Sequence, residues 1–141
     1  MSAPGSSIVS LRNVGKTFDN GTTALDGLTL DVRAGEFVSL LGPSGCGKST
    51  ALRIIAGLSA PSAGTVDWPA GAGQIGFVFQ EPTLMPWADV EANVRLPLKL
   101  AETDEAQSRA AALQALAHVS LADAARAYPR ELSGGMKMRA S

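Results

Sequence analysis

The most informative stretch of the sequence is Phe37-Val38-Ser39-Leu40-Leu41-Gly42-Pro43-Ser44-Gly45-Cys46-Gly47-Lys48-Ser49-Thr50. Residues 37–41 are apolar with hardly a break, which is typical of a parallel strand covered on both faces. Residues 42–49 match the pattern G-x-x-x-x-G-K-S/T without a mismatch. After Lys48, apolar residues recur at three- and four-residue spacing until Gly57, and Pro61 prevents continuation, which predicts a helix. Strand, glycine-rich loop and helix together are the context in which this pattern binds phosphate.

The chemistry of phosphate binding explains the residue types in this loop. Glycines let the backbone wrap a phosphate, so that successive N–H groups and the helix N-terminus face its negative charge. Lys48 brings a positive charge to the β- and γ-phosphates and is a candidate catalytic residue, and the Ser49 hydroxyl can ligate Mg²⁺. The candidate nucleotide-binding residues here are Gly42, Pro43, Ser44, Gly45, Cys46, Gly47, Lys48, Ser49 and Thr50. The alternative, a glycine-rich turn with an incidental lysine, explains neither the full match nor its position.

Composition restricts the class of protein. The chain has 141 residues, of which 45% are hydrophobic, enough for one globular domain with a core. Twelve basic and thirteen acidic residues leave a net charge of -1, so no overall field attracts nucleic acid or an anionic membrane surface. No apolar run approaches the roughly 20 residues of a spanning helix, and no secretion signal is recognisable. We therefore expect a cytoplasmic protein that binds no nucleic acid and whose single cysteine, Cys46, has no redox role.

Strands are expected on both sides of the phosphate loop. Period-two alternation of apolar and polar residues indicates half-buried antiparallel strands before the loop, with a turn signal at 19–21. After the loop, two short apolar segments flank a Gly- and Ala-rich turn at 69–73. The strands predicted in addition to 37–41 are residues 8–14, 28–32, 65–68 and 75–79.

The last third of the chain is predicted to be helical. Residues 88–100 carry apolar side chains at four-residue spacing, although Pro97 is expected to bend or end that helix. Residues 103–119 predict an alanine-rich helix with Thr103 as its N-cap.

A second candidate anion site is Leu132-Ser133-Gly134-Gly135-Met136. Ser133 can cap a helix start while Gly134 and Gly135 expose backbone N–H groups. This stretch resembles the LSGGQ signature of the ATP-binding subunits of ABC transporters, with Met136 in place of the usual glutamine. The resemblance implies that two domains dimerise head to tail, so that Ser133, Gly134 and Gly135 close over the γ-phosphate held by the second subunit.

Further residues fit the same resemblance. Gln80 is similar to the Q-loop glutamine, which implies a catalytic and metal-binding role beside Mg²⁺ and the attacking water. Phe18 occupies the place of the aromatic A-loop residue, which implies stacking on adenine, with a core phenylalanine as the alternative. His118, the only histidine, precedes the signature whereas the family's switch histidine follows it, so we assign it a solvated or packing role. The implied cofactors are ATP and Mg²⁺.

The resemblance covers residues 8–139 and implies an α/β fold. It implies a phosphate-loop NTPase core of ABC type, with a mixed sheet and an N-terminal antiparallel β subdomain, at about residues 7–86, and a helical subdomain at about 87–141. In the family the chain continues after the signature to the Walker B aspartate, the catalytic glutamate and the switch histidine, none of which these residues provide. We therefore expect the C-terminal part of the core to be missing, and the 141 residues alone to bind ATP without appreciable turnover.

One stretch, Glu81-Pro82-Thr83-Leu84-Met85-Pro86-Trp87, is similar to the nitrate, sulfonate and taurine importers. It implies an ATP-binding subunit that is peripheral to the cytoplasmic face of the inner membrane and drives uptake of a small anion through a membrane permease, indirectly with a solute-binding protein. One alternative is a truncated nucleotide-binding fragment without turnover. The other is a soluble ABC ATPase outside transport, against which the importer-like stretch argues.

Overall fold

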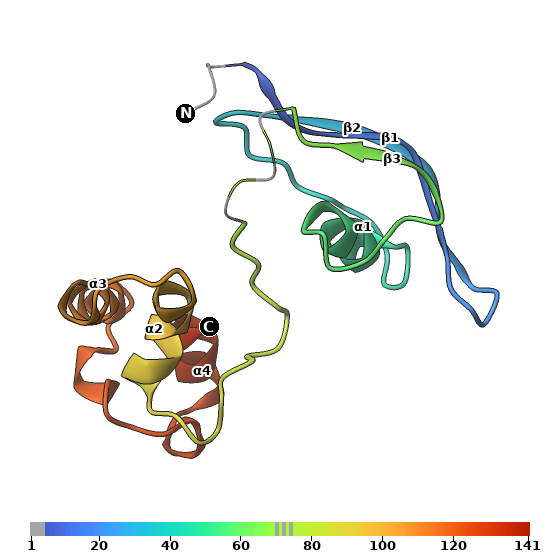
Figure 1. Cartoon of the computed structure of the whole chain (residues 1–141). Helices are drawn as coiled ribbons and strands as arrows, with labels where there is room; N and C mark the ends of the chain where they lie inside the picture. Colours follow the sequence, from blue (N-terminus) through green and yellow to red (C-terminus); the bar gives the residue numbers. More distant parts are fainter. Residues whose placement is uncertain (1–4, 70, 72, 74) are drawn as a thin grey trace. The chain divides into compact units, whose positions relative to one another are not determined.

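The computed structural model describes residues 5–69, 71, 73 and 75–141. The chain forms two compact units, of which the first ends at Phe77 and the second extends from Val78 to Ser141 (Figure 1). The boundary predicted from the sequence lies near residue 86. Within the described residues, no helix has the length and apolar character needed to cross a lipid bilayer.

The N-terminal unit contains a three-stranded antiparallel sheet with the order β2-β1-β3. Its strands are β1 (Ser7–Thr17), β2 (Thr23–Arg33) and β3 (Ala63–Asp67). The predicted turn at 19–21 joins β1 to β2, and the Phe18 N–H donates to the Thr22 carbonyl oxygen at 2.9 Å to close it. The antiparallel hairpin and the strand near residue 65 are thereby confirmed. The predicted turn at 69–73 contains residues outside the described ones.

Helix α1 (Lys48–Ile55) covers one face of this sheet (Figure 1). Ile54 packs with buried apolar residues of β1, which explains why apolar side chains recur along α1. The helix ends as predicted at Gly57, whose φ is 71°. The N–H of Gly57 donates to Ile54 (3.0 Å) and that of Leu58 to Arg53 (2.8 Å), a Schellman motif that satisfies the last carbonyl groups.

Two strand predictions are wrong. Residues 37–41 carry no regular strand, and the side chains of Phe37 and Leu41 are 92% and 91% exposed. Residues 75–79 likewise form no regular strand. An apolar run indicates that a segment is suited to burial in a parallel sheet, but a parallel strand needs a partner from a distant part of the chain. Within the described residues, 37–41 do not pair with another strand to form part of a sheet. Of the expected mixed sheet, only the antiparallel part is formed there.

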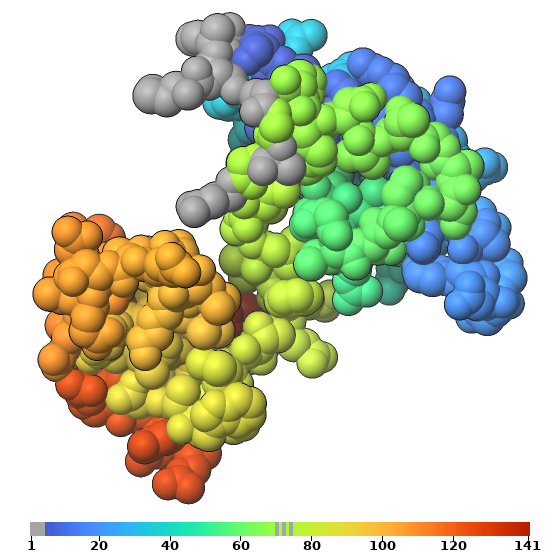
Figure 2. All heavy atoms as spheres, in the orientation of Figure 1, coloured from blue at the N-terminus to red at the C-terminus, as the bar shows by residue number. Residues whose placement is uncertain are grey.

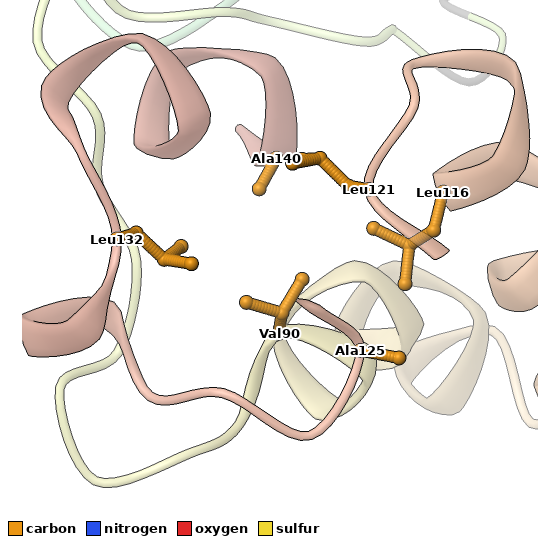
Figure 3. Packing of buried hydrophobic residues seen from close by; sticks show 6 residues of the cluster. All are labelled: Val90, Leu116, Leu121, Ala125, Leu132 and Ala140. Atoms are coloured by element: carbon orange, nitrogen blue, oxygen red, sulfur yellow. The ribbon is translucent and has the colours of Figure 1, made fainter. Parts of the chain in front are cut away.

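The C-terminal unit is a compact helical body, coloured yellow to red in the space-filling view (Figure 2). It contains α2 (Val90–Leu100), α3 (Glu105–His118), α4 (Gly134–Ala140) and the short 3₁₀ turns η1 (Ala122–Ala124) and η2 (Pro129–Glu131). Side chains from the three α-helices and the segments between α3 and α4 converge on one core (Figure 3). The residues of that core are Val90, Leu116, Leu121, Ala125, Leu132 and Ala140.

Both helices predicted for the last third of the chain before the signature stretch are present, as α2 and α3, but the cap of α3 differs from the predicted one. Asp104, and not Thr103, caps α3: its carboxylate accepts from the N–H groups of Ala106 (3.0 Å) and Gln107 (3.1 Å). A carboxylate is favoured there because it also faces the positive end of the helix dipole. Helix α2 continues through Pro97 to Leu100, so the proline does not end it.

A charged cluster joins α2 to α3. The Glu91 side chain is only 4% exposed, and its oxygens lie 3.2 Å from Arg109 Nε, 3.6 Å from Arg95 Nη1 and 3.6 Å from Arg126 Nη2. Arg95 is also buried and pairs with Glu105 across the two helices. A buried carboxylate is tolerated only with such partners, since desolvation of an unpaired charge costs several kcal/mol.

Candidate nucleotide-binding site

The phosphate loop, residues 42–47, is held against the sheet by its glycines. Gly47 has φ 91°, and a Cβ at this position would overlap the carbonyl oxygen of Ala24 in β2. Gly42 has φ 155°, and a Cβ there would lie 2.7 Å from the Cys46 Sγ. The backbone conformation favours glycine at both positions, and at Gly47 the backbone oxygen of Ala24 also leaves no space for a Cβ.

Lys48, the first residue of α1, turns its side chain back over the loop. Its Nζ donates to the carbonyl oxygens of Gly42 (2.8 Å) and Pro43 (2.6 Å), and lies 3.4 Å from the Cys46 Sγ. The ammonium group is therefore located in the curve of the loop, where a phosphate bound by the loop would meet it.

The start of α1 suits an anion. Its N-cap, Gly47, provides no side-chain hydrogen bond, and the first turn carries no acidic residue. The first N–H groups of a helix need partners, and phosphate oxygens are suitable ones. Ser49 lies in this turn with an exposed side chain. No cluster of three acidic, histidine or cysteine side chains suited to a metal occurs in the described part of the chain. A hydroxyl from Ser49 fits Mg²⁺, which takes few protein ligands beside phosphate and water.

Phe18 follows the strand that is connected to the phosphate loop through Leu25. It follows β1 directly, and its side chain is 43% exposed. Two residues earlier, Lys16 is paired with Leu25 of β2. Leu25 in turn reaches the loop, because a Cβ on Gly47 would be 2.8 Å from its Cδ2. The exposed ring argues against a core role for Phe18, and its assignment as the A-loop residue stays a prediction.

The other predicted site residues belong to the C-terminal unit. Gln80 is exposed near the start of that unit. Ser133 caps α4, accepting from the Met136 N–H at 3.2 Å, as the sequence predicted. Gly134 and Gly135 are exposed, and a Cβ on either would meet nothing within 4 Å. His118 is exposed in the last turn of α3, in agreement with a solvated role.

Lys16 is a residue of this region that was not predicted from the sequence. The Nζ of Lys16 lies 5.5 Å from the centroid of the Phe18 ring. Period-two alternation could have indicated this pair, because residues two apart in a strand share a face.

Comparisons with family models, curated relatives and solved structures agree with one another. The family model described as ABC transporter matches residues 25–141. An aliphatic sulfonates import ATP-binding protein, SsuB 1 of Mesorhizobium japonicum, is 44% identical over 143 residues, covering 99% of this chain and 53% of that protein. The uncharacterized ABC transporter ATP-binding protein YtlC of Bacillus subtilis is 46% identical over 125 residues, covering 85% of this chain and 48% of that protein. The chain thus spans about half the length of these curated relatives.

Among solved structures, the ATP-binding cassette MJ0796 is similar in fold. Its dimeric structure in a post-hydrolysis state with ADP and Pi superposes with a TM-score of 0.84 at 36% identity, covering 94% of this chain and 66% of that one. A second dimeric structure of the same cassette gives a TM-score of 0.85 at 35% identity. The α/β fold class expected from the sequence is therefore confirmed.

Proposed function

The chain belongs to the ABC transporter family of ATP-binding domains, and from this premise we propose that it is the ATP-binding part of an importer that couples ATP binding and hydrolysis to uptake of a small solute. The observation that carries the proposal is the phosphate loop: Gly47 has no space for a Cβ against β2, the Lys48 ammonium group is located in the curve of the loop, and no side chain caps the helix that follows.

Within this proposal, the phosphate loop, Phe18 and Gln80 have separate roles in ATP binding and hydrolysis. The backbone N–H groups of residues 42–50 and the N-terminus of α1 bind the phosphates of ATP. Lys48 releases the carbonyl oxygens of Gly42 and Pro43 and turns to the β- and γ-phosphates, which requires little movement because its Nζ already lies over the loop. Ser49 holds Mg²⁺, which supplies positive charge to the phosphates when bound. Phe18 stacks on the adenine, and Gln80 orients the attacking water beside the metal.

The signature residues act on a second subunit in the same proposal. Ser133, Gly134 and Gly135 close over the γ-phosphate bound by that subunit in a head-to-tail dimer. Support comes from the two glycines, which are exposed and have open space where a Cβ would lie, so nothing in the described chain explains the lack of side chains. The similar cassette MJ0796 is described as dimeric.

The transport role is proposed from the relatives. Several of them, including SsuB 1 of Mesorhizobium japonicum, are named aliphatic sulfonates import ATP-binding proteins. We infer for this chain an anion of the sulfonate, taurine or nitrate kind, a membrane permease as direct partner and a solute-binding protein as indirect partner. The proposed location is the cytoplasmic face of the inner membrane, as a peripheral subunit that binds no nucleic acid.

A polypeptide of these 141 residues alone is proposed to bind ATP without appreciable turnover. The residues include the proposed phosphate site, but no apolar strand ending in an acidic pair follows the signature stretch. Without such carboxylates, neither the metal nor the attacking water has its usual partner. Nucleotide binding without hydrolysis is therefore the second candidate function, proposed only for a polypeptide limited to these residues.

The test is ATP binding and hydrolysis by the full natural chain, with and without its membrane partner. Lys48→Ala should abolish hydrolysis and weaken ATP binding, whereas the control Lys99→Ala, on the exposed face of α2, should change neither. Gly135→Ala should preserve ATP binding and stability but reduce hydrolysis by the dimer, because a methyl group would occupy the space proposed for the γ-phosphate. Equal activity of the Lys48→Ala and Lys99→Ala variants would refute the proposal.

A further inference from the structure

The end of β1 contains a lysine that is fixed from two sides. The Lys16 Nζ donates to the carbonyl oxygen of Ala60, 2.8 Å away in the segment between α1 and β3. The same Nζ lies over the ring of Phe18, 5.5 Å from its centroid. This distance is within the range of about 6 Å in which a cation is attracted by the face of an aromatic ring. The ammonium group is thus a fixed support for the Phe18 ring.

Lys16 is connected to the phosphate loop through Leu25 of β2. Lys16 pairs with Leu25 on β2, and Leu25 contacts the position of Gly47 in the loop. Phe18 follows β1 at the start of the hairpin turn and keeps 43% of its surface exposed. A ring that has a cation against it and also has solvent-exposed surface can still stack on a flat ligand.

We propose that Lys16 is a positioning residue for the base of the bound nucleotide, acting through the Phe18 ring that it supports. This inference rests on the proposed nucleotide function of the chain. Fixing the ring in advance lowers the entropy cost of stacking, because a free phenylalanine side chain would have to be ordered when the nucleotide binds. Lys16 should therefore contribute to recognition of the base and not to recognition of the phosphates.

Two other roles for Lys16 predict different results. If its positive charge attracted the phosphates directly, its removal would weaken binding of any polyphosphate, with or without a base. If it served only to attach β1 to the segment at Ala60, its removal would lower stability and leave nucleotide affinity unchanged. Binding of ATP and of inorganic tripolyphosphate to the same variants separates these roles.

The experiment is a double-mutant cycle in the full natural chain, with Kd measured by calorimetry. Lys16→Met removes the charge at similar length, and Lys16→Gln removes the charge but keeps a donor for the Ala60 carbonyl. Lys16→Arg keeps a cation over the ring. Phe18→Leu removes the ring, and Lys99→Met is the control for net charge on an exposed lysine of α2.

The expected result is specific for the base. Lys16→Met and Lys16→Gln should weaken ATP binding roughly two- to five-fold, the size of an exposed cation–π contact, without changing the Kd of tripolyphosphate. Lys16→Arg should retain the wild-type affinity for ATP. In the Phe18→Leu background, the Lys16 substitutions should not change the Kd for ATP.

An equal loss for both ligands, an effect that persists without the Phe18 ring, or unchanged ATP affinity in Lys16→Gln would overturn the inference. Failure of the proposed function is distinguishable, because the wild-type chain would then show no ATP binding that depends on Lys48.

Discussion

Replacing Gly47 by alanine tests whether the phosphate loop is packed on the hairpin as the structure describes. The residue has φ 91°, and a Cβ would overlap the Ala24 carbonyl oxygen and approach Leu25 Cδ2 to 2.8 Å. A left-handed conformation costs a residue with a Cβ about 1–2 kcal/mol. Because the Ala24 oxygen belongs to the backbone of β2, the overlap can be relieved only by moving the loop or the strand. We expect a total destabilisation of about 3 kcal/mol or more, in the upper part of the range for single substitutions.

Gly57 provides the matched control for this prediction. It also has a left-handed φ, of 71°, and it lies at the other end of α1, but a Cβ there would meet nothing within 4 Å. Gly57→Ala should therefore cost only the conformational part, about 1–2 kcal/mol, and leave ATP affinity unchanged. The assay is urea unfolding of the full natural chain together with the Kd for ATP. Equal loss of stability in the two variants would show that the loop does not lie against Ala24, and the reasoning would be refuted.

Three further predictions concern stability. Asp104→Ala should destabilise the chain by about 1 kcal/mol because it removes the α3 cap, whereas Thr103→Ala should change the midpoint of urea unfolding little; the reverse order would reject the assigned cap. The hydrogen bond from Arg12 lowers the pKa of Asp31 below its usual value of 3.8, so this carboxylate stabilises the fold above the unfolded pKa and loses that contribution as pH falls through the folded pKa. Asp31→Asn should accordingly flatten the acid limb of a plot of stability against pH, and an unchanged slope would contradict the pair. Glu91→Gln should cost about 1–3 kcal/mol in thermal unfolding because a neutral amide replaces the buried carboxylate and leaves the buried Arg95 guanidinium poorly paired, and a neutral effect would show that the cluster is solvated.

Local sequence patterns determined the parts of the fold that depend on neighbouring residues. The hairpin turn, the phosphate loop, the Gly57 helix end and the Ser133 cap were all predicted, because each depends on the conformational preference of a few adjacent residues. Thr103 and Asp104 show the limit of this reasoning. Both residues are good caps and they are adjacent, so only the hydrogen bonds decide between them.

The parts that failed depend on distant residues. Residues 37–41 have the composition of a buried parallel strand, yet whether they form one depends on strands that the pattern does not identify. The same holds for the site. The sequence suggested Phe18 as an adenine contact only through a resemblance. Period-two alternation can indicate that Lys16 and Phe18 share a face, but the contact between the ammonium group and the ring is seen only in the structure.

The two glycine motifs of this chain differ in what requires their glycines. In the phosphate loop, positive φ angles favour glycine at positions 42 and 47, and at Gly47 the backbone oxygen of Ala24 also excludes a Cβ. In the signature stretch, Gly134 lies in ordinary helical conformation with open space around it, and alanine would be the better helix former there. A glycine that the described fold does not require is best explained by a surface that something else approaches closely. On the proposed function, the first motif is therefore expected to form the main part of a site within one unit, whereas the second is expected to become part of a site only when another molecule is in place, which is the arrangement that the proposed head-to-tail dimer supplies.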